Sequence, residues 1–205
     1  MARVVTFEGV EGAGKTTFAH WAAYELFSQG YEVFLSQEPF GAVGEFIRTH
    51  LLAGSPHQIP PLSQLFLFEA SRVEHARFLR SLRAAEADFV VLDRFVDSTL
   101  AYQGYALGLE ISLIESLNRM SSAEFWPCKT FLLDLDPKSA AERVRLRSGG
   151  NAWDTGQGAF FKAVREGFLR IAENNPDRVT VINALESQEI IRERVRRELQ
   201  SYGRP

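Results

Sequence analysis

The sequence contains a single cysteine, Cys128, among its 205 residues. One cysteine excludes an intrachain disulfide framework and CxxC metal chemistry, and it is typical of a protein from a reducing compartment. Long apolar runs are absent too. The run at residues 4–7 is too short for a secretion signal, and no later stretch approaches the roughly 20 residues that span a bilayer. We therefore expect a cytoplasmic protein without a membrane partner.

Clusters of charge of one sign are also missing. The net charge of −3 is spread over both halves of the chain, with no basic tail or acidic block. This pattern argues against a nucleic-acid partner and favours a small-molecule ligand. With 45% hydrophobic and 24% charged residues, the chain is long enough to bury a substantial core. We expect one domain over residues 1–205.

Apolar runs of strand length alternate with longer segments of helical period. The runs lie at residues 3–7, 31–36, 88–92, 129–135 and 178–182. Residues 89–92 are apolar at consecutive positions, as expected for a strand whose two faces are both covered by helices. The alternation predicts an α/β fold with a doubly wound parallel sheet flanked by helices. Ligands of such sheets bind beyond the carboxyl ends of the strands.

A phosphate-binding motif, G-x-x-x-x-G-K-[ST], follows the first of these runs. It comprises Gly9, Val10, Glu11, Gly12, Ala13, Gly14, Lys15 and Thr16, with Thr17 at the start of the next helix. Such a loop points backbone N–H groups at phosphates, while its lysine reaches the β and γ phosphates and its hydroxyl binds Mg²⁺. The alternative is a glycine-rich turn, but a chance match is on the order of one percent. The motif indicates nucleotide binding without defining the reaction.

The third run is followed by Asp93 and Arg94. Beside a phosphate-binding loop, such an aspartate can hold Mg²⁺ through water, and the arginine can bind an incoming phosphate with two hydrogen bonds. The alternative is a local ion pair that closes the strand. The pair suits phosphoryl transfer between two anions, with Thr16 and Asp93 as the expected metal site.

Four separated motifs resemble those of bacterial thymidylate kinases, which are P-loop nucleoside monophosphate kinases. They are Phe7-Glu8-Gly9 with residues 11–17, Glu38-Pro39, Phe68-x-x-x-Arg72, and Asp93-Arg94-Phe95-x-x-Ser98-x-x-Ala101-Tyr102-Gln103. The match is close over the first half of the chain and looser beyond it. The resemblance implies a P-loop kinase fold with a five-stranded parallel sheet and a short mobile lid at about residues 143–160. It also implies a homodimer that transfers the γ-phosphoryl group of ATP to dTMP with Mg²⁺.

The same resemblance implies an acceptor-binding region at about residues 38–104. Phe68 resembles the phenylalanine that stacks on thymine. Arg72, one helical turn later on the same face, resembles the arginine that hydrogen-bonds the edge of the base. From the residues alone, Phe68 within the apolar run 65–68 fits core packing better, and Arg72 could be a solvated helix arginine.

Further acceptor contacts are implied in the fourth motif and before it. Arg94 resembles the residue that binds the dTMP phosphate, and Arg48 resembles a second arginine near it. Thr99 and Gln103 correspond to polar contacts with the base, and Tyr102 to the tyrosine that favours deoxyribose. For Thr99 and Tyr102, a packing role on the helix surface is an equal alternative.

Two acidic residues complete the implied site. Glu11 resembles the residue that accepts a hydrogen bond from the sugar 3′-hydroxyl, although loop solvation is the simpler alternative. Glu38 is expected beside the substrate or Mg²⁺, but its flanking residues Gln37 and Phe40 depart from the family pattern Arg-Glu-Pro-Gly-Gly-Thr.

The lid is where the sequence departs most from the family. Its usual motif, Asp-Arg-x-Glu, supplies a catalytic arginine, whereas residues 151–154 read Asn-Ala-Trp-Asp. Arg143, Arg145 and Arg147 lie just before, and at most two of them can face the phosphates from one helix. Either Arg147 or Arg145 takes over the role, or the enzyme is slower. We name Arg147 with Lys15, Asp93 and Arg94 as the expected catalytic residues.

Two other classes of protein remain open from the residues. A deoxynucleoside kinase shares the loop and the acid–arginine pair, but it requires a carboxylate base for a sugar hydroxyl. A nucleotide-dependent switch or partitioning protein shares the loop alone. The combination of Phe68, Arg72 and Tyr102 argues against the switch.

Overall fold

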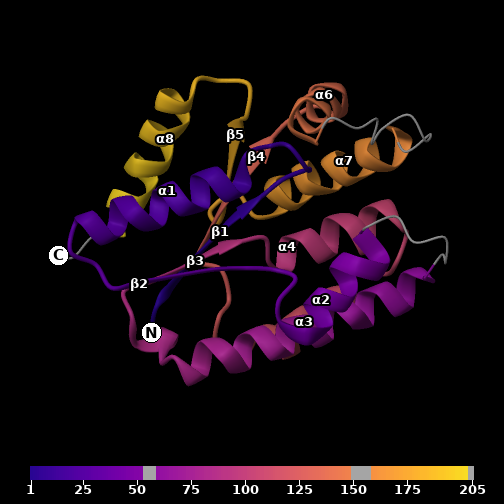
Figure 1. Ribbon diagram of the computed structural model, residues 1–205, viewed down its shortest axis with the longest axis horizontal. Helices are drawn as coiled ribbons and strands as arrows, with labels where there is room; N and C mark the ends of the chain where they lie inside the picture. The colour runs from indigo at the N-terminus through magenta and orange to yellow at the C-terminus, as the bar shows by residue number, and fades with distance from the viewer. Residues whose placement is uncertain (53–58, 149–157, 203–205) are drawn as a thin grey trace.

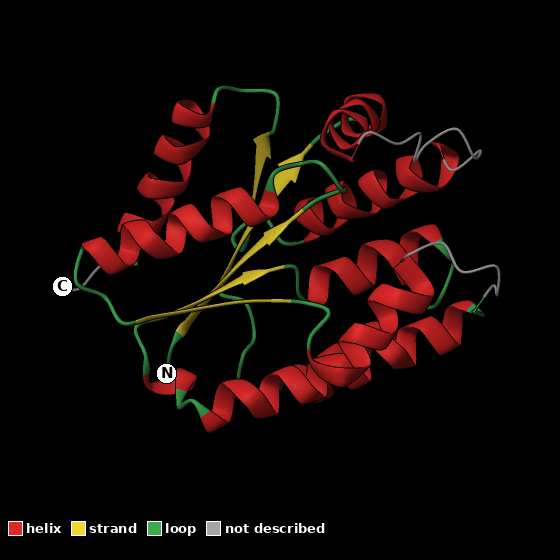
Figure 2. Ribbon diagram, in the orientation of Figure 1, coloured by secondary structure: helices red, strands yellow, loops and turns green. Residues whose placement is uncertain are grey.

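The computed structural model describes residues 1–52, 59–148 and 158–202, and Figure 1 shows their arrangement. A parallel sheet with strand order β2-β3-β1-β4-β5 forms its centre, and its strands run in one direction (Figure 2). The strands are β1 (Arg3–Glu8), β2 (Val33–Gln37), β3 (Phe89–Asp93), β4 (Lys129–Asp134) and β5 (Val179–Asn183). The predicted five-stranded parallel sheet flanked by helices is confirmed.

The helices fill the connections between these strands. They are α1 (Lys15–Ser28), α2 (Gly41–Phe46), α3 (Pro61–Ser81), α4 (Val96–Thr99), α5 (Ile111–Ser122), α6 (Pro137–Ser148), α7 (Gly158–Asn174) and α8 (Gln188–Gln200). Two π-helical segments, η1 (Ile47–Leu52) and η3 (Leu100–Ala106), and one 3₁₀ turn, η2 (Ala84–Glu86), complete the described elements. Among these helices, none has both the length and the apolar character needed to cross a membrane.

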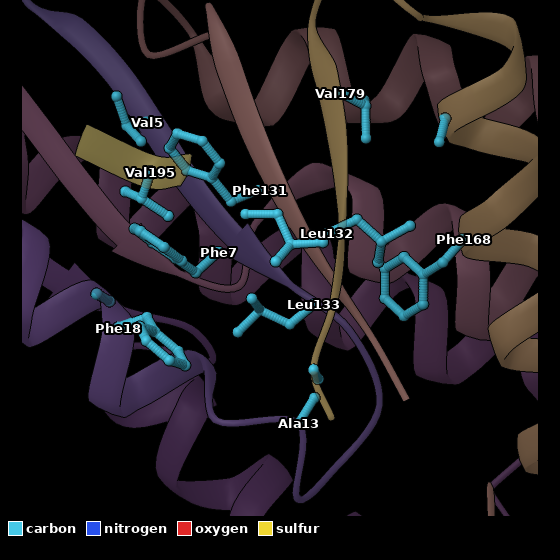
Figure 3. Packing of buried hydrophobic residues seen from close by; sticks show 14 of the residues in the cluster. Val5, Phe7, Ala13, Phe18, Phe131, Leu132, Leu133, Phe168, Val179 and Val195 are labelled. Carbon is cyan, nitrogen blue, oxygen red and sulfur yellow. The ribbon is translucent and has the colours of Figure 1, made fainter. Parts of the chain in front are cut away.

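The core lies on both faces of the sheet because β1 alternates its side chains between them. Val5 and Phe7 belong to the cluster that includes Phe18 of α1, and the Phe7 and Phe131 rings lie 5.2 Å apart. Figure 3 shows Phe7, Phe18 and Phe131 in this cluster. Val4 instead joins the cluster that contains Leu79 of α3. A strand buried on both faces needs an apolar residue at nearly every position.

The central position of β1 brings the two sequence motifs together. β1 lies between β3 and β4, and Phe7 is the register partner of Asp93. The phosphate-binding loop after β1 and the Asp93-Arg94 pair at the end of β3 therefore lie side by side. The fold places both motifs at the carboxyl edge, where ligands of parallel sheets bind.

α7 packs closely against η3, the segment that contains Tyr102 and Gln103. The contact depends on Gly167, because a Cβ atom there would lie 2.7 Å from the Cβ of Tyr105. Real Cβ atoms essentially never approach so closely, so this position requires glycine. The sequence did not predict the π-helical form of η3.

Candidate active site

The loop between β1 and α1 has the backbone of a phosphate-binding loop. Gly9, Gly12 and Gly14 have φ angles of 138°, 81° and 96°, which other residues rarely adopt. A Cβ atom on Gly9 would also lie 2.5 Å from the carbonyl oxygen of Leu133 in β4. Because α1 begins at Lys15, the loop leads directly to a helix N-terminus, whose N–H groups and dipole favour anions.

Lys15 lies buried under this loop. Its Nζ donates a hydrogen bond to the carbonyl of Val10 at 2.8 Å. Burial, together with the nearby positive charge of Arg94, lowers the pKa of Lys15 from 10.5 to about 7. A buried ammonium group without a bound anion is costly, so an arriving phosphate has a strong electrostatic partner at this position.

Thr16 and Asp93 meet at the start of α1. The Thr16 hydroxyl donates a hydrogen bond to Asp93 Oδ2, while Asp93 Oδ1 is buried without a hydrogen-bond partner in the described chain. A buried, unpartnered carboxylate oxygen beside a hydroxyl suits a hard cation such as Mg²⁺. The described residues contain no cluster of three or more metal-binding side chains. A metal here would therefore take most of its ligands from phosphates and water.

Arg94 is held in an uncommon backbone conformation, with a φ angle of 66°. Its backbone N–H donates to the carbonyl of Phe7 at 3.0 Å, which fixes the turn to the end of β1. Its Nη1 donates to the carbonyl of Gly9 and to the hydroxyl of Ser98, each at 3.1 Å. The guanidinium carbon lies 5.5 Å from the centre of the Tyr102 ring. These contacts place the arginine cation beside the phosphate-binding loop.

Glu8, the last residue of β1, accepts hydrogen bonds from the segment that follows Arg94. It is fully buried, and its Oε1 accepts a hydrogen bond from the Phe95 N–H at 2.7 Å. Its Oε2 accepts one from the Ser98 hydroxyl at 2.6 Å. Burial and, secondly, the charge of Asp97 raise the pKa of Glu8 from 4.5 to about 8. Sequence reasoning missed this residue as part of the site.

Arg72 is the most heavily bonded side chain of the acceptor region, and it is 1% exposed. Its Nε and Nη2 donate to Glu38 Oε2 at 3.1 and 2.9 Å, and its Nη1 donates to Glu69 at 3.0 Å. It also donates to Asn118 at 2.7 Å and to Thr99 at 2.8 Å. Burial opposes its charge, but the two carboxylates hold its pKa above the usual value. In this structure, Arg72 binds side chains of α3, α4 and α5 and of the segment that follows β2.

Glu38 therefore lies beside Arg72 rather than beside the phosphate-binding loop. Its second carboxylate oxygen lies 3.2 Å from Nδ1 of His75, a buried residue of α3. The backbone N–H of Glu38, however, donates to the carbonyl of Asp93 at 3.0 Å. The main chain at Glu38 thus adjoins the expected metal site, while its side chain stabilises the acceptor region.

Arg48 lines a cavity of about 430 Å³ that also contacts Asp93 and Phe40. The Arg48 guanidinium donates to the carbonyl of Pro39 at 2.5 Å and pairs with Glu45 at 3.0 Å. The structure thus brings Arg48 and Asp93 to the same cavity, although they are 45 residues apart in the chain. A phosphate in this cavity would have a cation within reach.

Tyr102 and Gln103 line the other side of the region. The Tyr102 ring lies 6.2 Å from each of the Phe160 and Phe168 rings of α7, with edge-to-face geometry. Gln103 is 4% exposed, and its amide lies 3.5 Å from that of Gln64. Phe68 is half-buried on α3, the same helix as Arg72. A flat ring between α3 and η3 would meet both aromatic and amide groups.

The structure describes the three arginines at the start of the expected lid to different extents. Arg143 donates to the carbonyl of Ala184 at 2.9 Å and to that of Gly12 at 3.4 Å, so it joins the phosphate-binding loop to the segment after β5. Arg145 is exposed on α6. The side chain of Arg147 and residues 149–157, which make up half of the expected lid, lie outside the described residues.

Besides Glu8, sequence reasoning missed several polar groups of this region. They are Glu69, His75 and Asn118. Asn118 offers the clearest signal, because it occupies a fully buried position of the amphipathic helix α5. A polar residue on an apolar helix face predicts a buried partner, although the sequence does not say which one.

A phosphate-binding loop, a lysine beneath it, an acid–arginine pair on the adjacent strand and a second, aromatic-lined region together define a P-loop kinase. A family model described as thymidylate kinase matches residues 7–195. The chain accordingly belongs to the thymidylate kinase family, a group of nucleoside monophosphate kinases.

Individual relatives give the same result over most of the chain. Thymidylate kinase from Exiguobacterium sibiricum is 31% identical over 97% of this chain and 94% of its own length. The enzyme of that name from Chlorobium luteolum is 39% identical over 88% of this chain and 89% of its own. The crystal structure of thymidylate kinase from Ehrlichia chaffeensis superposes with a TM-score of 0.75 at 33% identity, covering 97% of this chain and 98% of that one.

Proposed function

We propose that this chain transfers the γ-phosphoryl group of ATP to dTMP, giving dTDP and ADP. The observation that carries the proposal is the meeting of two motifs at one sheet edge. The loop with Lys15 follows β1, and the Asp93-Arg94 pair follows the neighbouring strand β3. A donor phosphate and an acceptor phosphate would each find a cation there. Membership of the thymidylate kinase family supports dTMP as the acceptor.

The residues suit direct, in-line transfer without a covalent intermediate. Lys15 would bind the β and γ phosphates, Arg94 would hold the dTMP phosphate in line, and Arg147 would bring a further positive charge from the lid. Fixed cations around the transferred group stabilise its charge and remove the entropic cost of bringing two anions together. Thr17 and the loop residues from Gly9 onward would contact ATP.

We propose that Thr16 and Asp93 hold Mg²⁺, Asp93 through its unpartnered Oδ1. When bound there, the cation neutralises charge on the ATP phosphates. The main chain of Glu38 lies near this position, where its N–H donates to the carbonyl of Asp93.

For the acceptor, we propose that dTMP lies between α3 and η3. Phe68 would stack on thymine, and the Arg72 cluster with Thr99 and Gln103 would present polar atoms to the edge of the base. Tyr102 would crowd the sugar 2′ position, Glu11 would accept from the 3′-hydroxyl, and Arg48 would assist Arg94 at the phosphate. Because Arg72 already has partners, it can reach the base only by exchanging one of them, such as Thr99.

An acceptor panel tests this assignment. In an ADP-release assay with ATP and Mg²⁺, we expect turnover chiefly with dTMP among dTMP, dUMP, dCMP, dGMP, UMP, thymidine and no acceptor. Arg94 and Arg48 provide cations for an acceptor phosphate, so thymidine should be phosphorylated at least about a hundred-fold more slowly. Faster turnover of thymidine would identify a nucleoside kinase. ADP release that needs no acceptor would identify an ATPase.

We also propose that the protein is a homodimer that forms through α3. Three large apolar side chains repeat along one face of this helix, and Leu62, Phe66 and Val73 are 44%, 55% and 53% exposed. Phe46 of α2 and Leu52 of η1 are exposed as well, at 43% and 59%. An apolar helix face of this kind is typical of an interface between subunits.

Substitution on this face tests the dimer. We expect Phe66→Asp to convert a species of twice 23.1 kDa into one of 23.1 kDa, measured by light scattering after gel filtration. The aspartate would place a charge in the centre of an apolar interface. Tyr24→Asp is the matched control, because Tyr24 is 70% exposed on α1, which packs against α8 and strands β1 to β3. A wild-type mass of 23.1 kDa would contradict the proposal.

Two further expectations accompany this function. We propose that residues 1–205 act as one kinase domain, since a single sheet carries both motifs. We also propose a cytoplasmic location, where ATP and the nucleotide precursors of DNA occur.

A further inference from the structure

Glu8 has no part in the reaction described so far, yet it is a buried carboxylate next to the phosphate-binding loop. Its two oxygens accept hydrogen bonds from two residues that follow Arg94, Phe95 and Ser98. Burying a carboxylate is expensive, and burial together with the charge of Asp97 raises the pKa of Glu8 to about 8. An uncharged residue could pack at this position more cheaply, so the carboxylate needs an explanation beyond packing.

Ser98 connects Glu8 to the acceptor arginine. The Ser98 hydroxyl has one proton, and it donates that proton to Glu8 Oε2 at 2.6 Å. Its lone pairs are therefore left for Nη1 of Arg94, which donates to the same oxygen at 3.1 Å. Because Glu8 Oε2 accepts the hydroxyl proton, the Ser98 oxygen can act toward Arg94 only as an acceptor. The charge of Arg94 in turn opposes the raised pKa of Glu8, so the two groups interact.

The backbone conformation of Arg94 explains why the turn needs the hydrogen bonds that Glu8 accepts. A non-glycine residue with a φ angle of 66° is less stable than one in the common regions, and here a long side chain must also point at the loop. Glu8 binds the backbone on the far side of the turn through the Phe95 N–H, and it binds the guanidinium through Ser98. Glu8 therefore holds both the backbone turn at Arg94 and, through Ser98, the guanidinium group of that residue.

We propose that Glu8 is a positioning residue that, through Ser98, orients Arg94 for the phosphate of the acceptor nucleotide. The inference rests on the proposed function, because it assigns Arg94 to that phosphate. Glu8 would touch neither substrate, and its effect would be confined to acceptors that carry a phosphate. A nucleoside without a phosphate would bind equally well with or without it.

The test compares binding of dTMP with binding of thymidine by titration calorimetry of the full chain. The measurements are made at pH 9, above the pKa of about 8, so that Glu8 is mostly ionised. Glu8→Gln keeps the shape and an oxygen for the Phe95 N–H, but it presents an N–H group to Ser98. Ser98→Ala removes the connection and leaves Glu8 in place. We expect each variant to raise the Kd for dTMP about ten-fold and to leave the Kd for thymidine within two-fold.

A matched control separates positioning from stability. Thr6 lies two residues before Glu8 on β1, is fully buried, and shares a 2.7 Å hydrogen bond with Thr130. Thr6→Val removes that bond without touching Arg94. We expect it to lower the midpoint of thermal unfolding while leaving both Kd values unchanged. The double variant Glu8→Gln/Ser98→Ala should bind dTMP no more weakly than the single variants, because each substitution breaks the same connection from Glu8 through Ser98 to Arg94.

Two outcomes would overturn the inference. In one, both variants bind dTMP as the wild type does; in the other, they lose thymidine and dTMP equally. Should Glu8→Gln not fold, Ser98→Ala decides between these outcomes by itself. A wild-type protein that does not phosphorylate dTMP, or binds it no better than thymidine, would instead remove the proposed function. The two failures are therefore distinguishable.

Discussion

Replacing Lys15 with methionine should lower kcat for dTMP phosphorylation by roughly a thousand-fold, because a fixed cation over the transferring phosphate is worth that much in comparable sites. Methionine keeps the length and the apolar stem of lysine, so the loop should retain its shape. Stopped-flow or ADP-release assays at saturating ATP and dTMP measure the effect. Lys15 is buried directly beneath the loop, where its Nζ would meet the phosphates.

The same substitution should not destabilise the protein. Burial lowers the pKa of Lys15 to about 7, which means that the folded state without ligand already disfavours the charge. Urea unfolding should therefore give an equal or higher free energy of unfolding for Lys15→Met. Lys162→Met is the control for activity, because Lys162 is exposed on α7. A kcat within ten-fold of the wild type would show that Lys15 is not the principal cation.

Replacing Arg72 with methionine should reduce the free energy of unfolding by about 3–5 kcal/mol. Removing one partner of a buried ion pair leaves the opposite charge unpaired, and measured losses of this kind fall in that range. Here two carboxylates, Glu38 and Glu69, lose their shared cation, and both are less than one-tenth exposed. Urea denaturation followed by far-ultraviolet circular dichroism measures the change.

An arginine on the same helix supplies the comparison. Arg80 also binds a carboxylate with more than one hydrogen bond, Glu124, but its side chain is 57% exposed. Arg80→Met should leave the urea midpoint unchanged, because solvent screens an exposed pair and hydrates the remaining carboxylate. If Arg72→Met cost no more stability than Arg80→Met, the Arg72 cluster would not hold the acceptor region together.

The fold and the donor side of the site could be predicted from sequence because their signals are local. The run at residues 89–92 predicted a strand buried on both faces, and Phe89, Val90, Val91 and Leu92 are each fully buried. Glycines at fixed spacing predicted the loop around Lys15 in the same way. Both patterns result from backbone geometry, which neighbouring residues largely determine.

The acceptor side could not be predicted in the same detail, because its contacts join distant parts of the chain. Arg72 binds Glu38 and Asn118, which are 34 and 46 residues away from it. No periodicity specifies which buried polar groups will meet. The sequence suggested that Arg72 points at a base or at solvent, whereas its guanidinium is enclosed by protein groups. Its role toward dTMP stays a prediction, as do the roles of Phe68 and Arg147.

The close approach of α7 to η3 at Gly167 has a mechanical consequence. Because the backbone of α7 presses on the Tyr105 side chain without a gap, the helix cannot shift toward η3 without pushing it. Tyr102, whose ring also packs against Phe160 and Phe168, would travel with it. α7 and η3 should therefore behave as one stiff body. If nucleotide entry and product release need a movement, we expect it at the edges of this unit rather than between α7 and η3.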